Sequence, residues 1–185
     1  PYMSSGIKLS RLCSLRVISL TIKPRLRKGQ HKMRLLAIMI FLTVGSVHAD
    51  PVIAPFKLEV FKSKTCGCCA KWIDQLNEKS FDAVGINLDQ LGSFKSSKGI
   101  ARKYQSCHTA LSSDGFVFEG HIPARYITEF LNNPIRGSIG LAVPGMPFGS
   151  PGMEVGARFD QYEVLVLMED GSSKVYARVK DPSDQ

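Results

Sequence analysis

Residues 56–76 read FKLEVFKSKTCGCCAKWIDQL and contain three cysteines within four positions. Before the cysteines, residues 56–61 alternate apolar and polar side chains, which is the period-two pattern of a half-buried strand. After them, the pattern changes to that of an amphipathic helix. The apolar face of that helix carries, at the i, i+3, i+4 and i+7 positions, Cys69, Trp72, Ile73 and Leu76. This stretch therefore predicts a strand, a turn that carries the cysteines, and a helix that begins at them.

The remaining elements are expected from the same periodicities and from turn residues. Strands are predicted over residues 83–88, 109–111, 116–118, 163–168 and 174–179. Hairpin turns within the two later pairs of strands are indicated by Asp114-Gly115 and Asp170-Gly171. Helices are predicted over residues 94–104 and 124–131.

Residues 140–156 contain five glycines and three prolines. We take such a density to indicate an irregular loop and to exclude both a helix and a central strand. The element order predicts an α/β fold of the α+β kind, in which helices flank a central mixed sheet. The Gly/Pro-rich loop and a C-terminal hairpin are added to this sheet. Residues 50–185 are predicted to form this single domain.

The formal net charge of +8 raises the question of binding to nucleic acid or to an anionic membrane. Nine of the 24 Lys and Arg lie in residues 1–49, which contain no acidic residue, so the rest of the chain carries 15 bases against 16 acids. A near-neutral domain lacks the clustered cations that release counterions from a polyphosphate. Nucleic-acid binding is therefore not predicted.

Residues 33–49 have the three-part pattern of a secretory signal peptide. A basic start is followed by an apolar run over residues 35–42 and by small residues at Val47 and Ala49. The run is too short to span a bilayer, which takes about 20 residues. We predict export with cleavage near Ala49 and no membrane span in the mature protein. An amphipathic or buried helix is the alternative for this segment.

Residues 1–32 are basic, contain serine and lack acidic residues. We predict that they are an upstream extension outside the mature protein, with a true start at Met33, and a transit peptide is the alternative. Cys13 lies in this segment and is expected to play no part in the mature protein.

The outer cysteines of the run, Cys66 and Cys69, form a C-x-x-C pair at the start of the predicted helix. Helix N-termini carry unpaired N–H groups and a partial positive charge, which lower thiol pKa values and favour the thiolate. The thiolate both attacks disulfides and binds metals, so this position permits either a thiol-disulfide oxidoreductase or a metal site. Structural disulfides are a further alternative in an exported protein, although adjacent cysteines are hard to pair locally.

Cys68 favours the metal site, since it would compete in disulfide exchange but supplies another ligand to a metal. A single zinc ion would use the adjacent Cys68 and Cys69 poorly, because their side chains point in different directions. Several Cu(I) ions bridged by shared thiolates would use both, and soft ligands select Cu(I). Equal numbers of thiolates and Cu(I) ions are electrically neutral, and burying a neutral cluster costs less than burying a charged one.

Five further residues are candidate ligands or shields of a soft-metal site: Cys107, His108, His121, Met146 and Met153. Each has a structural alternative. A lone cysteine is often a small buried apolar residue, a lone histidine a satisfied core or surface residue, and a methionine a packing residue. Both methionines lie in the Gly/Pro-rich loop and not in a core-like pattern, which favours a role in the site. Trp72 is predicted to be a core residue.

Four segments occur in order along the chain: KTCGCC at residues 64–69, SCHTA at 106–110, EGHIP at 119–123 and GLAVPGMPFGSPGME at 140–154. Together they resemble the CopG-type copper-resistance family, whose members are often described only as metal-binding domains of unknown function. The resemblance runs from about Phe56 to Arg178. It implies a thioredoxin-like fold, a periplasmic location and copper bound by the cysteines. The cysteines to which that role carries over are Cys66, Cys68, Cys69 and Cys107.

We therefore expect a periplasmic protein that binds Cu(I), in a polynuclear cluster, and contributes to copper resistance by sequestering copper, transferring it or changing its oxidation state. Its expected partners are copper ions and periplasmic copper efflux or chaperone proteins. The residues expected to bind metal or to shape the site are His108, His121, Met146 and Met153. The alternatives are a thiol-disulfide oxidoreductase that uses Cys66 and Cys69, and a structural zinc module. Copper oxidoreduction is the one enzymatic activity that we leave open.

Overall fold

The computed structural model describes residues 55–185. The predicted signal peptide over residues 33–49, its cleavage near Ala49 and the predicted upstream extension over residues 1–32 lie outside the described residues and stay predictions. Within residues 55–185, no helix is long and apolar enough to cross a membrane.

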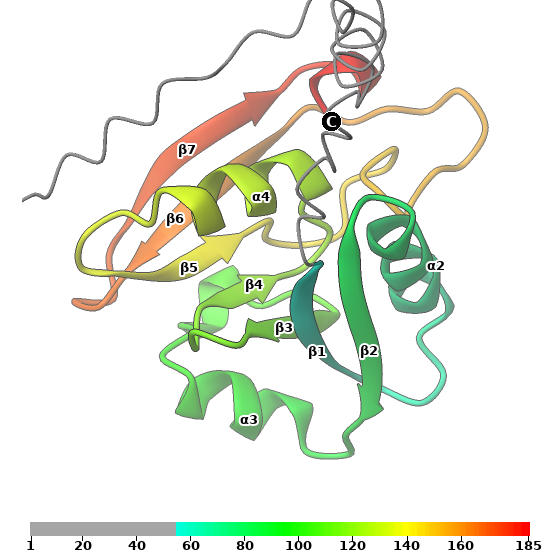
Figure 1. The fold of residues 1–185 in the computed structure, drawn as a ribbon. Helices are drawn as coiled ribbons and strands as arrows, with labels where there is room; N and C mark the ends of the chain where they lie inside the picture. The colour runs from blue at the N-terminus through cyan, green and yellow to red at the C-terminus, as the bar shows by residue number, and fades with distance from the viewer. Residues whose placement is uncertain (1–54) are drawn as a thin grey trace, which may run out of the picture. The chain divides into compact units, whose positions relative to one another are not determined.

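Seven strands form one sheet in the order β2-β1-β3-β4-β5-β6-β7 (Figure 1). The pairs β1 with β2 and β4 with β5 are parallel, and the other four pairs are antiparallel. The strands are β1 (Phe56–Lys62), β2 (Phe81–Asn87), β3 (His108–Ser112), β4 (Val117–Glu119), β5 (Ser138–Ala142), β6 (Tyr162–Met168) and β7 (Ser173–Val179). The predicted mixed sheet of an α/β protein is therefore confirmed, whereas its description as thioredoxin-like stays a prediction.

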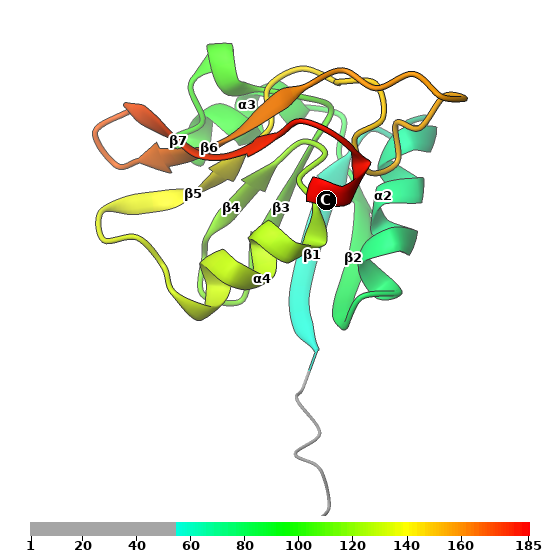
Figure 2. The same ribbon diagram turned by 90° about the horizontal axis from the view of Figure 1, so that it is seen from above.

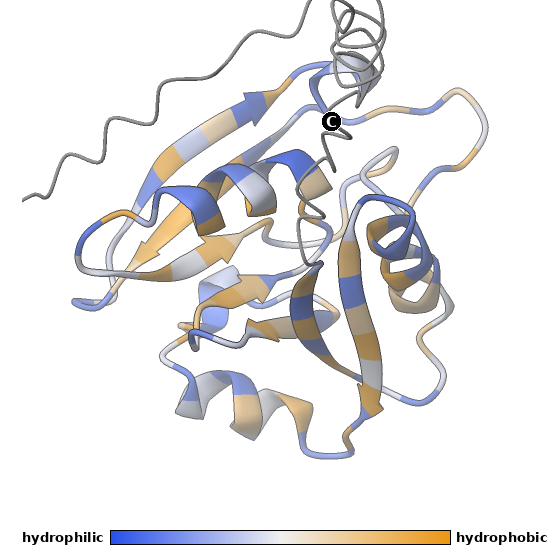
Figure 3. Cartoon of the chain, in the orientation of Figure 1, coloured by the Kyte–Doolittle hydropathy of each residue, from blue (hydrophilic) through white to orange (hydrophobic). Residues whose placement is uncertain are grey.

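Within the described part of the chain, three helices accompany the sheet: α2 (Gly67–Asn77), α3 (Leu91–Ser97) and α4 (Ala124–Asn132). Two 3-10 turns, η2 (Arg102–Tyr104) and η3 (Pro182–Asp184), complete the described elements. Figure 2 shows α3 and α4 on opposite sides of the sheet. Hydropathy alternates along most of β1 (Figure 3), which is the period-two pattern from which this strand was predicted.

Two hydrophobic clusters cover the two faces of the sheet. The larger cluster contains Phe118 of β4 and Leu141 of β5 together with buried residues of α2 and α4. The smaller cluster contains their neighbours Val117 and Ala142 together with the segment that follows α3. Successive residues of a strand point to opposite faces, so each cluster lies on its own face of the sheet. Helices α2 and α4 therefore share one face.

Most predicted elements begin and end within about two residues of the observed ones. The helix predicted over residues 94–104 was wrong in its extent. Helix α3 begins earlier, at Leu91, and ends at Ser97, after which Gly99 adopts a positive φ that ends the helix. The remaining part of the predicted helix is the separate turn η2.

The prediction that residues 140–156 contain no central strand was also wrong. The segment begins inside β5, which lies between β4 and β6 in the interior of the sheet. Gly140 has a φ of 146°, and a Cβ atom there would overlap the carbonyl oxygen of Val117 on β4. Glycine at this position is therefore what allows β4 and β5 to pair closely, and close backbone approach is a common reason for glycine inside a strand.

Candidate metal centre

The cysteine run lies at the start of α2, as predicted. Cys66 is the N-cap residue in an extended conformation and makes no side-chain capping hydrogen bond, while Cys68 and Cys69 lie in the first turn. The first turn contains no acidic residue. The unpaired N–H groups and the positive end of the helix dipole therefore lie at the turn that carries the sulfur atoms.

The fourth cysteine reaches this turn through the pairing of β1 with β3. Lys62, the last residue of β1, pairs with His108, the first residue of β3. Cys107 precedes that pair and therefore lies beside the turn that leaves β1. The Sγ atoms of the four predicted cysteines, Cys66, Cys68, Cys69 and Cys107, all lie within 4.8 Å of one another. The structure thus brings together the whole predicted cysteine set.

Two of these cysteines form a disulfide bond. It joins Cys66 to Cys69, whose Cα atoms are 5.3 Å apart. Cys68 and Cys107 are the free thiols among the described cysteines, and the Sγ atoms of Cys66 and Cys68 are 3.5 Å apart. Adjacent cysteines such as Cys68 and Cys69 are hard to pair with each other, but Cys66 and Cys69 are three positions apart and can form the bond. All four sulfur atoms become available to a metal only after this bond is reduced.

Two buried histidines contact Cys107. Its Sγ atom lies 3.3 Å from Nδ1 of His108 and 3.0 Å from Nε2 of His121. These three side chains form a second group whose ligand atoms lie within 4.8 Å of one another, and both histidines are fully buried. Cys107 therefore belongs to a sulfur group on one side and to a mixed sulfur and nitrogen group on the other.

The Gly/Pro-rich loop orients one of the histidines. Nδ1 of His121 lies 2.8 Å from the carbonyl oxygen of Pro151. A carbonyl can only accept a hydrogen bond, so Nδ1 carries the proton and Nε2 presents its lone pair toward Cys107. Metal-binding histidines are commonly held in this way by a second hydrogen bond. This contact supports the prediction that His121 belongs among the candidate ligands or shields of the site.

His108 lies between two aromatic rings. Its ring centroid is 4.3 Å from that of Trp72 and 4.9 Å from that of His121. Nε2 of His108 is buried and has no hydrogen-bond partner. Trp72 is fully buried, which confirms the prediction that it belongs to the core.

Burial keeps these groups uncharged in the metal-free protein. It lowers the pKa of His108 well below the ordinary histidine value, and it also lowers the pKa of His121. Burial, and then the neighbouring Cys68 thiol, raises the pKa of Cys107 to about 12. A metal that binds Cys107 must therefore displace its proton, which links metal binding to proton release.

We expect the metal-free protein to lose stability as the pH falls below about 6.5, the pKa of an unfolded histidine. Both imidazoles have lower pKa values in the folded state, so the unfolded state binds more protons below that pH. The loss should reach at most about 1.4 kcal/mol per pH unit for each histidine. Urea unfolding at several pH values would measure it. His121→Asn should reduce the slope, and a flat profile in the wild type would contradict the assignment of neutral buried histidines.

The loop that holds His121 also touches the cysteine turn. A Cβ atom on Gly152 would lie 2.7 Å from the carbonyl oxygen of Cys68, so only a residue without a side chain permits this approach. Met153, the next residue, is half-buried and outside the hydrophobic core, whereas Met146 lies earlier in the loop and is 53% exposed. Met153 therefore directly follows the residue that approaches the cysteine turn, whereas Met146 does not.

A buried ion pair, which no pattern in the sequence predicted, lies beside Cys107. It joins Lys95 of α3 to Glu119 at the end of β4, and both residues are almost completely buried. Burial raises the pKa of Glu119, and the ammonium group of Lys95 opposes that shift. Lys95 lies between Phe94 and two serines, and lysine is almost never fully buried unless it is paired, so nothing in the local pattern indicates its burial. Glu119 ends an apolar strand, and that position is the only signal that could have found it.

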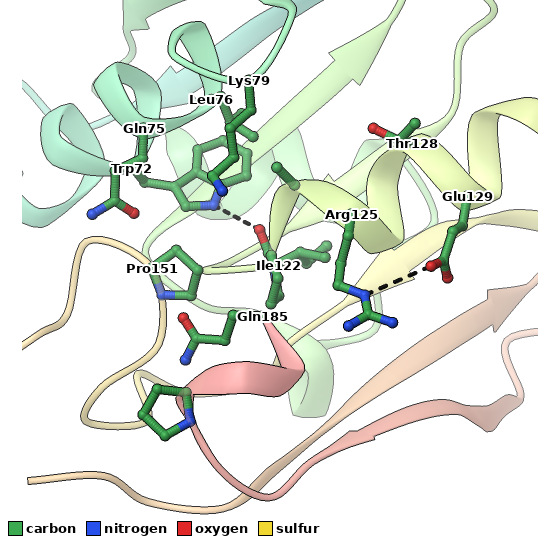
Figure 4. A pocket seen from close by; sticks show the side chains of 13 residues that line it. Trp72, Gln75, Leu76, Lys79, Ile122, Arg125, Thr128, Glu129, Pro151 and Gln185 are labelled. Carbon is green, nitrogen blue, oxygen red and sulfur yellow. Dashed lines mark hydrogen bonds and ion pairs between the residues drawn. The ribbon is translucent and has the colours of Figure 1, made fainter.

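A groove of about 590 Å³ lies between α2, the start of α4 and the C-terminus (Figure 4). The indole Nε1 of Trp72 donates a hydrogen bond of 2.9 Å to the carbonyl oxygen of Ile122 at its wall, and Arg125 and Glu129 form an exposed pair at its rim. No described cysteine or histidine lines it. The groove therefore contains none of the candidate ligands, although Trp72 and Pro151, which contact His108 and His121, form part of its wall.

A mixed α/β domain with four clustered cysteine sulfurs and two buried imidazoles defines a candidate metal-binding protein with soft ligands. Comparison with known proteins narrows this class. Two solved structures, described as copper resistance protein copG in Form 2 and Form 1, are 38% and 37% identical to the chain, each with a TM-score of 0.64. The alignments cover 68% and 69% of this chain and 98% and 99% of theirs. The chain therefore belongs to the CopG-type copper-resistance family, as its four motifs indicated.

Residues 104–153 match a family model described as a protein of unknown function, DUF411. This range includes Cys107, both buried histidines and the loop that touches α2. No curated protein matches the chain.

Proposed function

We propose that this chain is a periplasmic copper-binding protein that holds Cu(I) in a polynuclear thiolate cluster and contributes to copper resistance. The observation that carries the proposal is the gathering of four cysteine sulfurs within 4.8 Å of one another. Its two structural relatives are named copper resistance proteins. The proposed ligands are Cys66, Cys68, Cys69 and Cys107.

The softness of the donors and the names of the two relatives support copper. Three of the sulfurs come from one turn, and Cys68 and Cys69 are adjacent in the chain. Sulfurs within 4.8 Å of one another can surround one tetrahedral ion or bridge several ions, and soft thiolate ligands select Cu(I). A neutral cluster also suits a site in which Cys69 is fully buried. Within this proposal the residues that complete or shield the cluster are His108, His121, Met146 and Met153.

Copper loading is expected to require reduction of the Cys66–Cys69 disulfide. Two electrons and two protons convert that bond to two thiols, which then lose their protons when they bind metal. Fully reduced protein, loaded with Cu(I) under anaerobic conditions, should therefore bind several Cu(I) ions per chain. Protein that retains the disulfide should bind fewer. Metal analysis after removal of unbound copper measures both, and equal copper in the two forms would contradict the four-thiolate site.

The disulfide also favours a second function, a thiol-disulfide oxidoreductase in which Cys66 attacks and Cys69 resolves. The bond joins the C-x-x-C pair at a helix N-terminus, where thiolates are stabilised. A disulfide-reductase assay on metal-free protein separates the two functions. The oxidoreductase requires turnover that survives Cys68→Ser and is lost in Cys66→Ser.

The proposed setting is the periplasm, reached through the signal peptide over residues 33–49. Periplasmic copper efflux or chaperone proteins are the proposed partners. In that setting the site would sequester copper, pass it to a partner or change its oxidation state, and the last of these would make the protein a copper oxidoreductase.

A further inference from the structure

Helix α3 is attached to the rest of the domain in an unusual way. Its only fully buried residue is a lysine, Lys95, and not an apolar residue. The ammonium group of Lys95 pairs with Glu119 and also donates a hydrogen bond of 2.8 Å to the carbonyl oxygen of Ser106. That carbonyl belongs to the peptide bond between Ser106 and Cys107. The lysine thus contacts the backbone directly before the fourth cysteine of the site.

The carboxylate of Glu119 contacts the same segment on both sides of Cys107. Its Oε1 atom accepts a hydrogen bond from the backbone N–H of Ser106, and its Oε2 atom accepts one from the hydroxyl of Thr109. Thr109 and Glu119 are opposite each other in the pairing of β3 with β4. One buried carboxylate therefore holds the residues that flank Cys107 and His108.

Two more contacts complete the enclosure of this segment. The hydroxyl of Ser106 donates to the carbonyl oxygen of Gly145 in the Gly/Pro-rich loop, and the N–H of Gly120 donates to the carbonyl oxygen of His108 over 3.0 Å. The ion pair itself binds both backbone groups of Ser106: Lys95 donates to its carbonyl oxygen, and Glu119 accepts from its N–H. Neither Lys95 nor Glu119 is among the groups of residues whose atoms could jointly hold a metal.

Stability alone gives little reason to bury such a pair, because the cost of removing two charges from water often equals or exceeds their attraction. Well-packed apolar residues of similar size would fill the space at least as favourably. The charged groups instead hold their hydrogen-bond partners in a defined position, since charge-assisted hydrogen bonds are short and geometrically specific. Apart from the contact between the two side chains, every side-chain hydrogen bond of the buried pair joins Lys95 or Glu119 to the segment that carries Cys107.

We infer that the Lys95–Glu119 pair is a clamp of two positioning residues, which fixes the Ser106–Thr109 segment so that the Cys107 sulfur completes the metal centre. This inference rests on the proposed function. It states that Lys95 and Glu119, which bind no metal themselves, set the position of the Cys107 thiolate. Residues that orient metal ligands in this way typically change metal affinity by about 10- to 100-fold when they are replaced.

The test uses Lys95→Met, Glu119→Gln and the double variant that combines them. Each single variant leaves one buried charge unpaired and is expected to fold poorly. The double variant leaves no buried charge and is expected to fold. Its Cu(I) affinity, measured anaerobically by competition with a chelator, should be lower than that of the wild type by about 10- to 100-fold. The matched control is Arg178→Met/Glu163→Gln, which removes the exposed pair between β6 and β7 and should keep the wild-type affinity.

A second readout needs no copper. In fully reduced, metal-free protein, the rate at which iodoacetamide labels Cys107 should rise in the double variant, while the labelling of Cys66 and Cys68 stays the same. Peptide mass spectrometry measures each cysteine separately. Val166→Ala, in the buried part of β6, controls for a loss of stability that does not involve the clamp. It should not accelerate the labelling of Cys107 selectively.

The outcomes separate the clamp from the proposed function. If the wild type binds Cu(I), and the double variant keeps both the copper affinity and the Cys107 labelling rate of the wild type, the clamp is overturned. If the wild type binds no Cu(I), the proposed function fails and the labelling rate alone decides the clamp. Selective acceleration at Cys107 then supports it, and an unchanged rate overturns it.

Discussion

Cys107→Ser is expected to lower the Cu(I) affinity of the reduced protein by at least about 100-fold, more than the change of any residue that only orients a ligand. Cys107 is the one cysteine of the site that comes from outside the α2 turn, and its sulfur also contacts His108 and His121. A serine oxygen is a hard ligand, which Cu(I) does not favour. Anaerobic chelator competition measures the affinity, and metal analysis measures the copper content per chain.

The comparison with Cys68→Ser decides whether the copper forms a cluster. If thiolates bridge several ions, each variant should lower the copper content per chain, because each removes a bridge. Unchanged copper content in both variants would contradict the cluster. Ser113→Ala, an exposed change in the turn after β3, is the control and should bind as the wild type does. A thermal unfolding curve for each variant shows whether the protein has kept its fold.

Gly120→Ala is expected to cost the metal-free protein about 2–5 kcal/mol of unfolding free energy. Gly120 has a φ of 79°, which an alanine adopts only with strain. In addition, a Cβ atom there would overlap the carbonyl oxygen of Val143 and lie 2.8 Å from the Cβ of Ser106. Backbone must move to make room, because Val143 presents main-chain atoms. The shift in the midpoint of urea unfolding measures the loss.

Gly115→Ala is the matched control for this change. Gly115 has a φ of 85°, but a Cβ atom there would meet nothing within 4 Å. It should therefore cost only the conformational strain, about 1–2 kcal/mol. Equal losses in the two variants would show that the contacts of Gly120 with Val143 and Ser106 are not as close as the structure has them. The Gly120→Ala variant should also bind copper more weakly, because Gly120 connects Glu119 to His121.

The parts of the fold that were predicted correctly are those with a local pattern. Alternation over residues 56–61 and the apolar face of α2 depend on neighbours a few positions apart, and both elements were found with little error. The errors fall where a distant contact overrides the pattern. Gly140 is a strand residue because β4 approaches it closely, and α3 buries a lysine because Glu119 lies opposite it. In both cases the contacting residue, Val117 for Gly140 and Glu119 for Lys95, lies far away in the sequence.

The chemical nature of the site follows from the sequence. Soft donors are specified by three cysteines at the start of a helix, a fourth beside a histidine and a methionine-bearing loop, and the four motifs indicate the family. How these donors meet depends on contacts that form only in the folded chain. The pairing of β1 with β3 brings Cys107 to the helix, the carbonyl of Pro151 selects the nitrogen that His121 presents, and the buried pair holds the segment between them. Each of these is a contact between residues distant in sequence, whose partners are set by strand register and loop packing, and no local periodicity encodes them.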